Sequence, residues 1–409
     1  MLNRVENIIS RIQELASISE TPGVTTRRYG TAAAIAAGDK VLHWMREAGL
    51  ETRIDAIGNI RGRWPSEDPA ARTLVIASHL DTVVNAGRWD GPLGVLAGLD
   101  ILENLIRRKI RLPHHVELIA FCDEEGVRFH TTYLGSRVVA GSFDPETLQS
   151  RDEDGIMLAA AITAARGNPD NLQQEAIPAD RWLGYFELHI EQGPILYERR
   201  IPVAAVKAIA GQIRGEVSFT GMAGHAGTVP MAMRHDALCG AAEFILAAEQ
   251  EAAAGGGGFL ATIGRLRISD SASNVIPGQV SCSIDIRSAH PDTLSAAHSR
   301  LKTLAETIAT RRGLTAQWQV VQSSPPVACD GRMKDGLVQC IEKAGYEALE
   351  LVSGAGHDAV PISAVAPVSM LFVRCYKGIS HHPLENVEPA DLAAALAIAE
   401  DFVIHITKG

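Results

Sequence analysis

Apolar residues repeat along the chain in two patterns that predict helices and strands. Val5, Ile8, Ile9, Ile12 and Leu15 recur at helical spacing, so an amphipathic helix is expected near the start. Further helices are expected over 31–48, 92–108 and 389–405. Short apolar runs of the kind found in strands buried in a parallel sheet span 73–78, 116–122, 185–190 and 368–375. Strands that alternate with helices predict an α/β fold.

The pattern changes between residues 211 and 324. Apolar and polar residues alternate over 213–220, which predicts a half-buried strand. A helix, two strands, a second helix and a last strand are then expected over 232–253, 259–268, 280–287, 291–312 and 315–321. This β-α-β-β-α-β order is that of a ferredoxin-like domain. We therefore expect residues 211–324 to be inserted into an α/β domain formed by residues 1–210 and 325–409.

Length and composition limit the classes of protein to consider. The 409 residues are too many for one comfortable core, which agrees with two domains. The formal net charge is −10 and no run of basic residues is longer than three, so no nucleic-acid partner is expected. No window approaches the roughly 20 apolar residues of a membrane span. Six scattered cysteines without a CxxC pair suit a reducing compartment, and we expect a cytoplasmic protein.

Histidines and carboxylates lie at the ends of all four apolar runs. They are His79, Asp81, Asp123, Glu124, Glu125, His189, Glu191, His381 and His382. In an open α/β sheet, ligands bind beyond the carboxyl ends of the strands, so these side chains are expected to meet at one edge. Imidazole nitrogens and carboxylate oxygens are suitable ligands for divalent metal ions. The sequence therefore predicts a metal site.

Asp90 has two interpretations. It lies in Arg88-Trp89-Asp90-Gly91, directly before the helix expected over 92–108. A turn or helix-capping residue is one interpretation. The other is a carboxylate that bridges two metal ions a few ångströms apart. Both can hold together.

Together these residues carry a family resemblance. The motifs are His79-x-Asp81, Asp90-Gly91, Asp123-Glu-Glu-Gly126, Glu187-Leu-His-Ile-Glu-Gln-Gly-Pro194 and Ser380-His-x-Pro-x-Glu385. They resemble the M20-type metallopeptidase and amidohydrolase family over nearly the whole chain, from about residue 20 to 405. More narrowly, they resemble the branch that contains allantoate amidohydrolases, ureidoglycolate amidohydrolases, N-carbamoyl-L-amino-acid hydrolases and β-ureidopropionases.

The resemblance implies a role for each candidate at the metal site. It implies two divalent ions, manganese or zinc, held by His79, Asp90, Glu125, His189 and His381, with Asp90 as the bridge. Glu124 would be the general base, since the attacking water needs a nearby carboxylate to take its proton. Asp81 would orient His79 from outside the ligand set. The alternative ligand His382 falls in the variable position of the Ser-His-x-Pro pattern.

The resemblance also implies substrate-binding residues. His225, in a glycine-rich loop, would stabilise the tetrahedral intermediate in the active site of a neighbouring subunit, so a homodimer joined through the inserted domain is implied. Asn274 and Arg287 would hold a substrate carboxylate, with Gln212 and His357 as further contacts. Taken alone, His225 could be a surface residue of a turn, and Arg287 could form a surface salt bridge with Asp285.

Three stretches are most similar to allantoate amidohydrolases: Asp123–Phe129, His225–Met231 and Met370–Cys375. The expected reaction releases ammonia and carbon dioxide from one ureido group of allantoate and leaves ureidoglycine. Hydrolysis of N-carbamoyl-L-amino acids is the alternative, since it requires nearly the same metal ligands. A catalytically inactive ligand-binding dimer is a third possibility, but all five candidate ligands and Glu124 are present. A wider-family aminopeptidase is disfavoured by Asn274 and Arg287.

Overall fold

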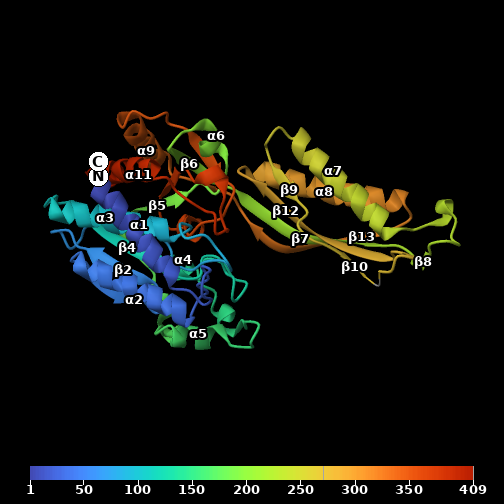
Figure 1. Ribbon diagram of the computed structural model, residues 1–409, viewed down its shortest axis with the longest axis horizontal. Helices are drawn as coiled ribbons and strands as arrows, with labels where there is room; N and C mark the ends of the chain where they lie inside the picture. The colour runs from blue at the N-terminus through green and yellow to red at the C-terminus, as the bar shows by residue number, and fades with distance from the viewer. Residues whose placement is uncertain (270, 409) are drawn as a thin grey trace. The chain divides into compact units, whose positions relative to one another are not determined.

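The computed structural model describes residues 1–269 and 271–408, which form two compact units (Figure 1). The first unit comprises residues 1–207 and 329–409, and the second comprises residues 208–328. These bounds lie slightly outside the expected 211–324, because Val327 and Ala328 pair with Ile209 and Ala208. None of the helices in the described part of the chain is long and apolar enough to cross a membrane.

A mixed β-sheet forms the centre of the first unit, and its last strand pairing, between residues 208–209 and 327–328, lies at the boundary of the second unit. Its strands are β1 (Glu51–Ile54), β2 (Ile60–Trp64), β3 (Thr73–His79), β4 (His115–Phe121), β5 (Trp182–Ile190), β6 (Val203–Ile209), β14 (Val327–Ala328), β15 (Glu350–Ser353) and β16 (Val368–Val373). They follow the order β1-β2-β4-β3-β5-β16-β6-β14, with β15 paired to β6. The four strands expected from apolar runs, β4, β3, β5 and β16, are parallel neighbours. Their carboxyl ends therefore meet at one edge.

Helices cover this sheet and share its hydrophobic core. They include α1 (Leu2–Ser17), α2 (Ala32–Glu47), α3 (Pro92–Arg107), α9 (Gly331–Lys343) and α11 (Pro389–Lys408). The apolar face expected for the first helix is buried, as Val5, Ile8, Ile12 and Leu15 show. Helix α3 packs closely on the sheet, since a Cβ at Gly94 would lie 2.3 Å from the carbonyl oxygen of Leu188. Shorter helices of this unit are α4 (Leu134–Val139), α5 (Leu158–Ala164), α6 (Ile195–Arg199) and α10 (Ala359–Ile362).

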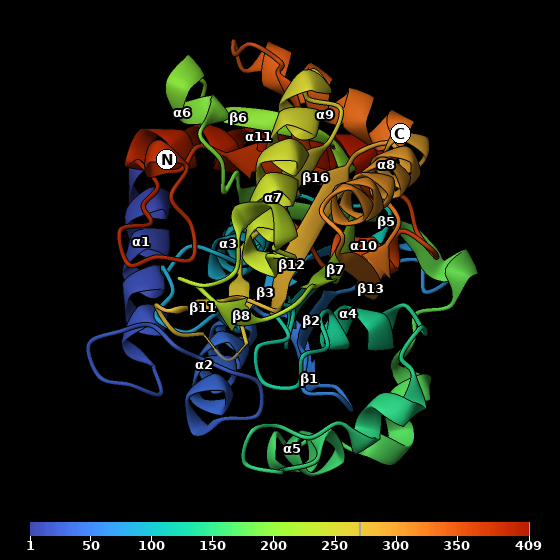
Figure 2. The ribbon, with the colours of Figure 1, turned by 90° about the vertical axis from the view of Figure 1, so that its right-hand side faces the viewer.

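The second unit is an antiparallel sheet with two helices on one face. Its main elements are β7 (Gly211–Thr220), α7 (Ala237–Ala254), β9 (Leu260–Thr262), β10 (Leu266–Ile268), β12 (Gln279–Ser288), α8 (Pro291–Arg311) and β13 (Thr315–Ser324). The sheet order is β10-β12-β7-β13, with β9 also paired to β12. Figure 2 shows α7 and α8 side by side, and their apolar residues form one core with the strands. The two-residue strands β8 (Gly224–His225) and β11 (Val275–Ile276) pair with each other.

Two predicted boundaries in the second unit are corrected. The strand expected over 259–268 is two short strands separated around Gly264. Helix α7 begins at Ala237 instead of residue 232, because the Asp236 side chain accepts the N–H groups of Leu238 and Cys239 and caps it there. In the first unit, the strand expected to reach residue 375 ends at Val373.

Candidate metal centre

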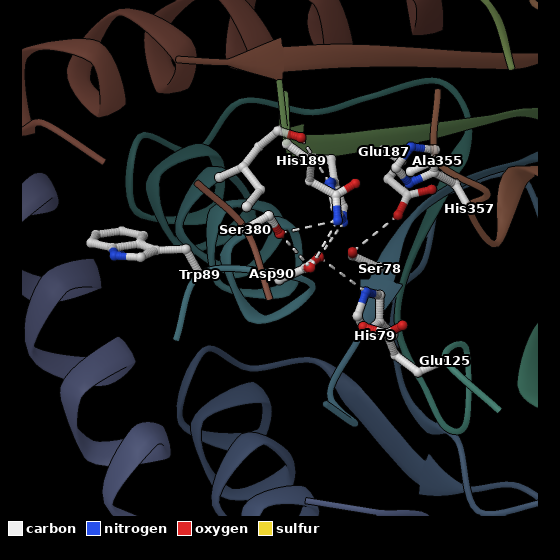
Figure 3. Close-up of polar contacts among 12 residues, drawn as sticks. Ser78, His79, Trp89, Asp90, Glu125, Glu187, His189, Ala355, His357 and Ser380 are labelled. Atoms are coloured by element: carbon white, nitrogen blue, oxygen red, sulfur yellow. Dashed lines mark hydrogen bonds and ion pairs between the residues drawn. The ribbon is translucent and has the colours of Figure 1, made fainter. Parts of the chain in front are cut away.

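Asp90 lies where the candidate ligands converge (Figure 3). Its Oδ1 is 3.0 Å from Nε2 of His189 and 3.6 Å from Nε2 of His79. Its Oδ2 is 3.0 Å from Nε2 of His381, whose Nε2 is also 3.2 Å from Oε1 of Glu125. Two groups of potential metal ligands therefore share one carboxylate, each group using a different oxygen. This is the arrangement expected of a bridging ligand.

The strands explain why these side chains meet. His79 ends β3 and His189 lies near the end of the neighbouring strand β5. Glu125 follows β4 and His381 follows β16, so each arrives at the same edge. Asp90 comes from the loop before α3. There Gly91 has a φ of +83°, and a Cβ on it would lie 2.5 Å from the His79 ring.

Backbone carbonyls orient two of the imidazole rings. Nδ1 of His79 lies 3.1 Å from the carbonyl oxygen of Asp81, and Nδ1 of His189 lies 2.9 Å from that of Ile190. A carbonyl oxygen only accepts, so each Nδ1 carries the proton and each Nε2 offers a lone pair. Although Nε2 of His189 is close to Asp90, it is buried without a hydrogen bond of good geometry. A cation bound by this nitrogen would satisfy it, so the residues fit a divalent metal ion.

The electrostatics of the cluster favour an ionised Asp90. Burial opposes its charge, but the close approach of the His189, His381 and His79 rings outweighs burial and lowers the pKa of Asp90 well below its ordinary value. Hydrogen bonds to Asp90 and Glu125 raise the pKa of His381 to about 10. Both shifts indicate that the carboxylates of Asp90 and Glu125 favour positive charge at this cluster, as a metal ion would supply.

Glu124 and Asp81 lie beside the cluster. Glu124 is buried, and burial raises its pKa well above the ordinary value against the opposing charge of His79. Asp81 contacts His79 mainly through its backbone carbonyl, while its carboxylate Oδ1 is 3.7 Å from Nδ1 of that ring. The same carboxylate accepts the backbone N–H groups of Glu124 and Glu125. This second contact was not expected from the sequence.

Three further residues around Asp90 were missed by sequence reasoning. Gln192 donates from Nε2 to Oδ2 of Asp90 at 2.8 Å, and Ser380 donates from Oγ to the same oxygen at 3.0 Å. Glu385 accepts the backbone N–H of Asp90 at 3.0 Å. All three lie in the motifs that contain the candidate histidines. Their place in these motifs was the only signal in the sequence, and it did not show that they contact Asp90.

The two adjacent histidines differ in position. His381 lies in the cluster, whereas Nδ1 of the exposed His382 accepts the backbone N–H of Leu384 within a turn. The five expected ligands therefore lie close together in the structure. Of the two adjacent histidines, His381 is the one that joins them, and His382 does not.

His357 is a buried neighbour of the cluster. Its Nε2 lies 2.7 Å from Oγ of Ser353, and its ring centroid is 4.6 Å from that of His189. Burial, together with the nearby His189, lowers the pKa of His357 well below its ordinary value. The edge-to-face contact places His357 beside a candidate ligand, and its contact with substrate stays a prediction.

The candidate substrate residues of the second unit form two separate pairs. Gln212 lies opposite Arg287 in the ladder between β7 and β12. His225 pairs with Val275 beyond the other end of these strands, where the carbonyl oxygen of Asn274 accepts the N–H of Ala226. The strands have ten residues each, so the two pairs are roughly 30 Å apart at ~3.3 Å per residue. One small molecule cannot contact both pairs of the same unit.

Arg287 makes the salt bridge considered as its alternative interpretation. Its Nε and Nη2 donate to the two oxygens of Asp285 at 3.0 and 2.9 Å. Arg214 donates to the same carboxylate at 3.0 Å. The guanidinium is therefore held in a defined orientation, with a quarter of its side chain exposed.

Comparison with known proteins identifies the family. The model of peptidase family M20/M25/M40 matches residues 75–405. The chain belongs to this family. The N-carbamoyl-L-amino acid amidohydrolase of Geobacillus stearothermophilus is 37% identical over 405 residues, covering 99% of both chains. Allantoate deiminase 1 of Glycine max is 36% identical over 428 residues, covering 95% of this chain and 87% of the relative.

A solved structure of the M20 type agrees with the fold. The crystal structure of an amidase of the hydantoinase/carbamoylase family from Burkholderia multivorans matches with a TM-score of 0.92 and 31% identity. The match covers 99% of this chain and 98% of that chain. The predicted family and its α/β fold are confirmed, and the protein is a hydrolase of a metal-dependent family with a candidate metal-binding cluster.

Proposed function

We propose that the protein hydrolyses the carbamoyl C–N bond of a small, carboxylate-bearing ureido substrate, and that allantoate is this substrate. The observation that carries the hydrolytic part is the position of Asp90, whose two oxygens face His79 and His189 on one side and His381 on the other. Two observations support the choice of allantoate. The stretches Asp123–Phe129 and His225–Met231 resemble those of allantoate amidohydrolases, and several relatives are allantoate deiminases.

Two divalent ions, manganese or zinc, are proposed as cofactors. His79 and His189 would hold one ion and Glu125 and His381 the other, with Asp90 shared between them. Such ions lower the pKa of water and polarise a carbonyl oxygen. The carbonyl acceptors at Nδ1 of His79 and His189 support this assignment, because they turn Nε2 of each ring toward Asp90 and leave it as the nitrogen that a cation would take.

Glu124 is the proposed general base. Its buried carboxylate would take a proton from the attacking water and return it to the departing nitrogen, which leaves as ammonia. The carbamate that remains would lose carbon dioxide, and allantoate would become ureidoglycine. Water supplies the atoms that complete both products. The hydrogen bonds that the backbone N–H groups of residues 124 and 125 donate to Asp81 support the role, since they fix the backbone that carries both carboxylates.

The second unit is proposed to be a lid and dimerisation domain. His225 would stabilise the tetrahedral intermediate in the active site of the partner subunit. Asn274, Arg287 and Gln212 would bind the substrate carboxylate and its neighbouring groups. The separation of the two pairs along β7 and β12 supports a homodimer, because a small substrate needs contributions from two subunits to contact both pairs.

N-carbamoyl-L-amino acids are the second candidate substrates. The relative from Geobacillus stearothermophilus favours them, at 37% identity over 99% of the chain. The two substrate classes share the carbamoyl group and a carboxylate, so the same ligands and base would serve either. The biological roles differ, since allantoate hydrolysis would place the protein in purine catabolism.

Ammonia release tests the proposal. Protein reconstituted with manganese or zinc would be compared on allantoate, a panel of N-carbamoyl-L-amino acids and ureidoglycolate. We expect turnover of allantoate, and about 10²–10⁴-fold less with Glu124→Gln at unchanged metal content. Preference for N-carbamoyl-L-amino acids would support the second candidate, and no ammonia from any substrate would refute both.

A further inference from the structure

Glu385 is a buried carboxylate that connects two loops of the candidate metal centre. Its Oε1 accepts the backbone N–H groups of Trp89 and Asp90 at 2.7 and 3.0 Å. Its Oε2 lies 3.2 Å from Oγ of Ser380, which is 3.0 Å from Oδ2 of Asp90. The N–H of Glu385 donates to the carbonyl oxygen of His382 and closes the turn after the candidate histidine ligand. Glu385 therefore contacts both the backbone and, through Ser380, the side chain of Asp90.

Gly87 shows how closely the loop before Asp90 packs on this carboxylate. A Cβ at Gly87 would lie 2.3 Å from both the carboxyl carbon and Oε1 of Glu385, which is closer than real Cβ atoms approach. Gly87 does not have a positive φ, so the need for glycine here comes from the close approach alone. Only 1% of Glu385 is exposed, and its carboxylate cannot move aside into solvent.

We propose that Glu385 is a positioning residue that fixes Asp90 in its bridging orientation. The inference rests on the metal centre of the proposed function. A carboxylate that bridges two ions must present both oxygens at defined angles, and hydrogen bonds outside the ligand set supply such orientation. Glu385 holds the peptide group of Asp90 through Oε1, and Ser380 holds one of its oxygens. Glu385 acts through its two accepting oxygens. None of these hydrogen bonds joins it to a candidate histidine ring.

Metal affinity tests this role without reference to any substrate. Zn²⁺ binding to the full-length protein would be measured by competition with a chromophoric chelator. Glu385→Ala removes both accepting oxygens, and we expect about 10–100-fold weaker binding. Glu385→Gln keeps an oxygen for the two N–H groups and an amide that can donate to Ser380. Because it retains the hydrogen bonds, we expect it to restore affinity to within about 3-fold of wild type.

Two glycine variants provide a matched comparison. Gly87→Ala leaves every hydrogen-bonding group in place but pushes a methyl group against Glu385, so it should weaken Zn²⁺ binding as Glu385→Ala does. Gly331→Ala is the control, since a Cβ there meets nothing within 4 Å. Circular dichroism would show whether Glu385→Ala folds. If it does not, the comparison would be made with Gly87→Ala and Ser380→Ala instead.

Three outcomes would overturn the inference. Wild-type affinity in a folded Glu385→Ala would do so, as would wild-type affinity in both Gly87→Ala and Ser380→Ala. Equal losses in Glu385→Gln and Glu385→Ala would show that charge, and not hydrogen bonding, is what matters. The proposed function fails separately, through absence of ammonia release, and the affinity ratios can be read in either case.

Discussion

Asp81 accepts the backbone N–H of Glu124 through Oδ1 at 3.0 Å. Its Oδ2 accepts the next N–H, that of Glu125, at 3.1 Å, and its carbonyl oxygen faces Nδ1 of His79. One residue thus orients a candidate ligand on β3 and the two carboxylates that follow β4. Asp81 therefore connects His79 at the end of β3 to the backbone that carries the proposed base and a proposed ligand after β4.

Replacing Asp81 by Asn should separate its two roles. The backbone carbonyl is retained, so His79 keeps its acceptor, but one carboxylate oxygen becomes an NH₂ group that faces an N–H donor. We expect kcat to fall about 10–100-fold, the range typical of such outer positions. Steady-state kinetics and metal content would be measured together. Asp144→Asn is the control, because the exposed Asp144 also accepts a backbone N–H, from Glu146, far from the cluster in sequence. Unchanged kcat in Asp81→Asn would contradict the role.

A buried ion network should determine the stability of the first unit. Arg4 of α1 pairs with Asp100 of α3 at 2.6 Å and with Glu400 of α11 at 2.8 Å. Both carboxylates are nearly inaccessible to water. Arg4→Met would leave Asp100 buried without this cation, whereas Glu400 keeps Arg108 and Asn104 as partners, so we expect a loss of about 3 kcal/mol in the free energy of unfolding. Urea denaturation would measure it.

The control for this prediction is an exposed ion pair. Arg111 lies 3.8 Å from Glu67, and both side chains are largely exposed. Arg111→Met should change the free energy of unfolding by less than about 0.5 kcal/mol. Equal effects of the two substitutions would show that burial of the network is not what stabilises α1.

Asp285 should give the second unit a stability that depends on pH. Burial favours its neutral form, but hydrogen bonds and charges of Arg287 and Arg214 outweigh burial and lower its pKa. The folded state therefore binds this proton less tightly than the unfolded chain. The stabilisation is present above the ordinary pKa of about 3.9 and is lost as pH falls through the lowered value.

Asp285→Asn should accordingly destabilise the protein at pH 7 by up to about 1 kcal/mol, since the pairs are partly exposed and screened. The difference from wild type should shrink as pH falls below about 4. Unfolding curves between pH 3 and 7 would measure it, with added salt expected to reduce the difference. A difference that is constant across this range would refute the electrostatic origin.

The sequence predicted the centre of the fold well, because short continuous apolar runs gave the four parallel strands. It missed β1, β2 and β6. These strands are short or mix apolar and polar residues, and their side chains become buried only when neighbouring elements pack against them. At the site, strand ends identified His79 and His189 because the geometry of a parallel sheet is general.

The contacts around Asp90 were beyond sequence reasoning for a physical reason. Ser380 and Glu385 reach Asp90 across 290 and 295 positions of the chain. Nothing in the local pattern encodes which backbone N–H a distant carboxylate accepts. The pairing of Gln212 with Arg287, at the opposite end of the strands from His225, required the register of β7 and β12.

Mixed dimers should reveal whether His225 serves the partner subunit. His225→Ala and Glu124→Gln should each be nearly inactive alone. In a mixed dimer, the His225→Ala subunit keeps its own Glu124 and receives His225 from its partner, so one of two sites is intact. Random mixing should then restore about a quarter of wild-type ammonia release. Recovery would be measured after dissociation and reassembly, and its absence would contradict a shared site.

A second mixture tests whether His225 and Asn274 act as one unit. His225 ends β8 and Asn274 directly precedes β11, so both lie at the strand pair β8–β11, beyond the end of β7 and β12. If this strand pair serves the partner subunit, a mixture of His225→Ala with Asn274→Ala should not recover, because every site receives one altered residue. Recovery to about a quarter would instead mean that Asn274 acts in its own subunit while His225 crosses to the other. Only the first result agrees with one strand pair carrying both residues into one site.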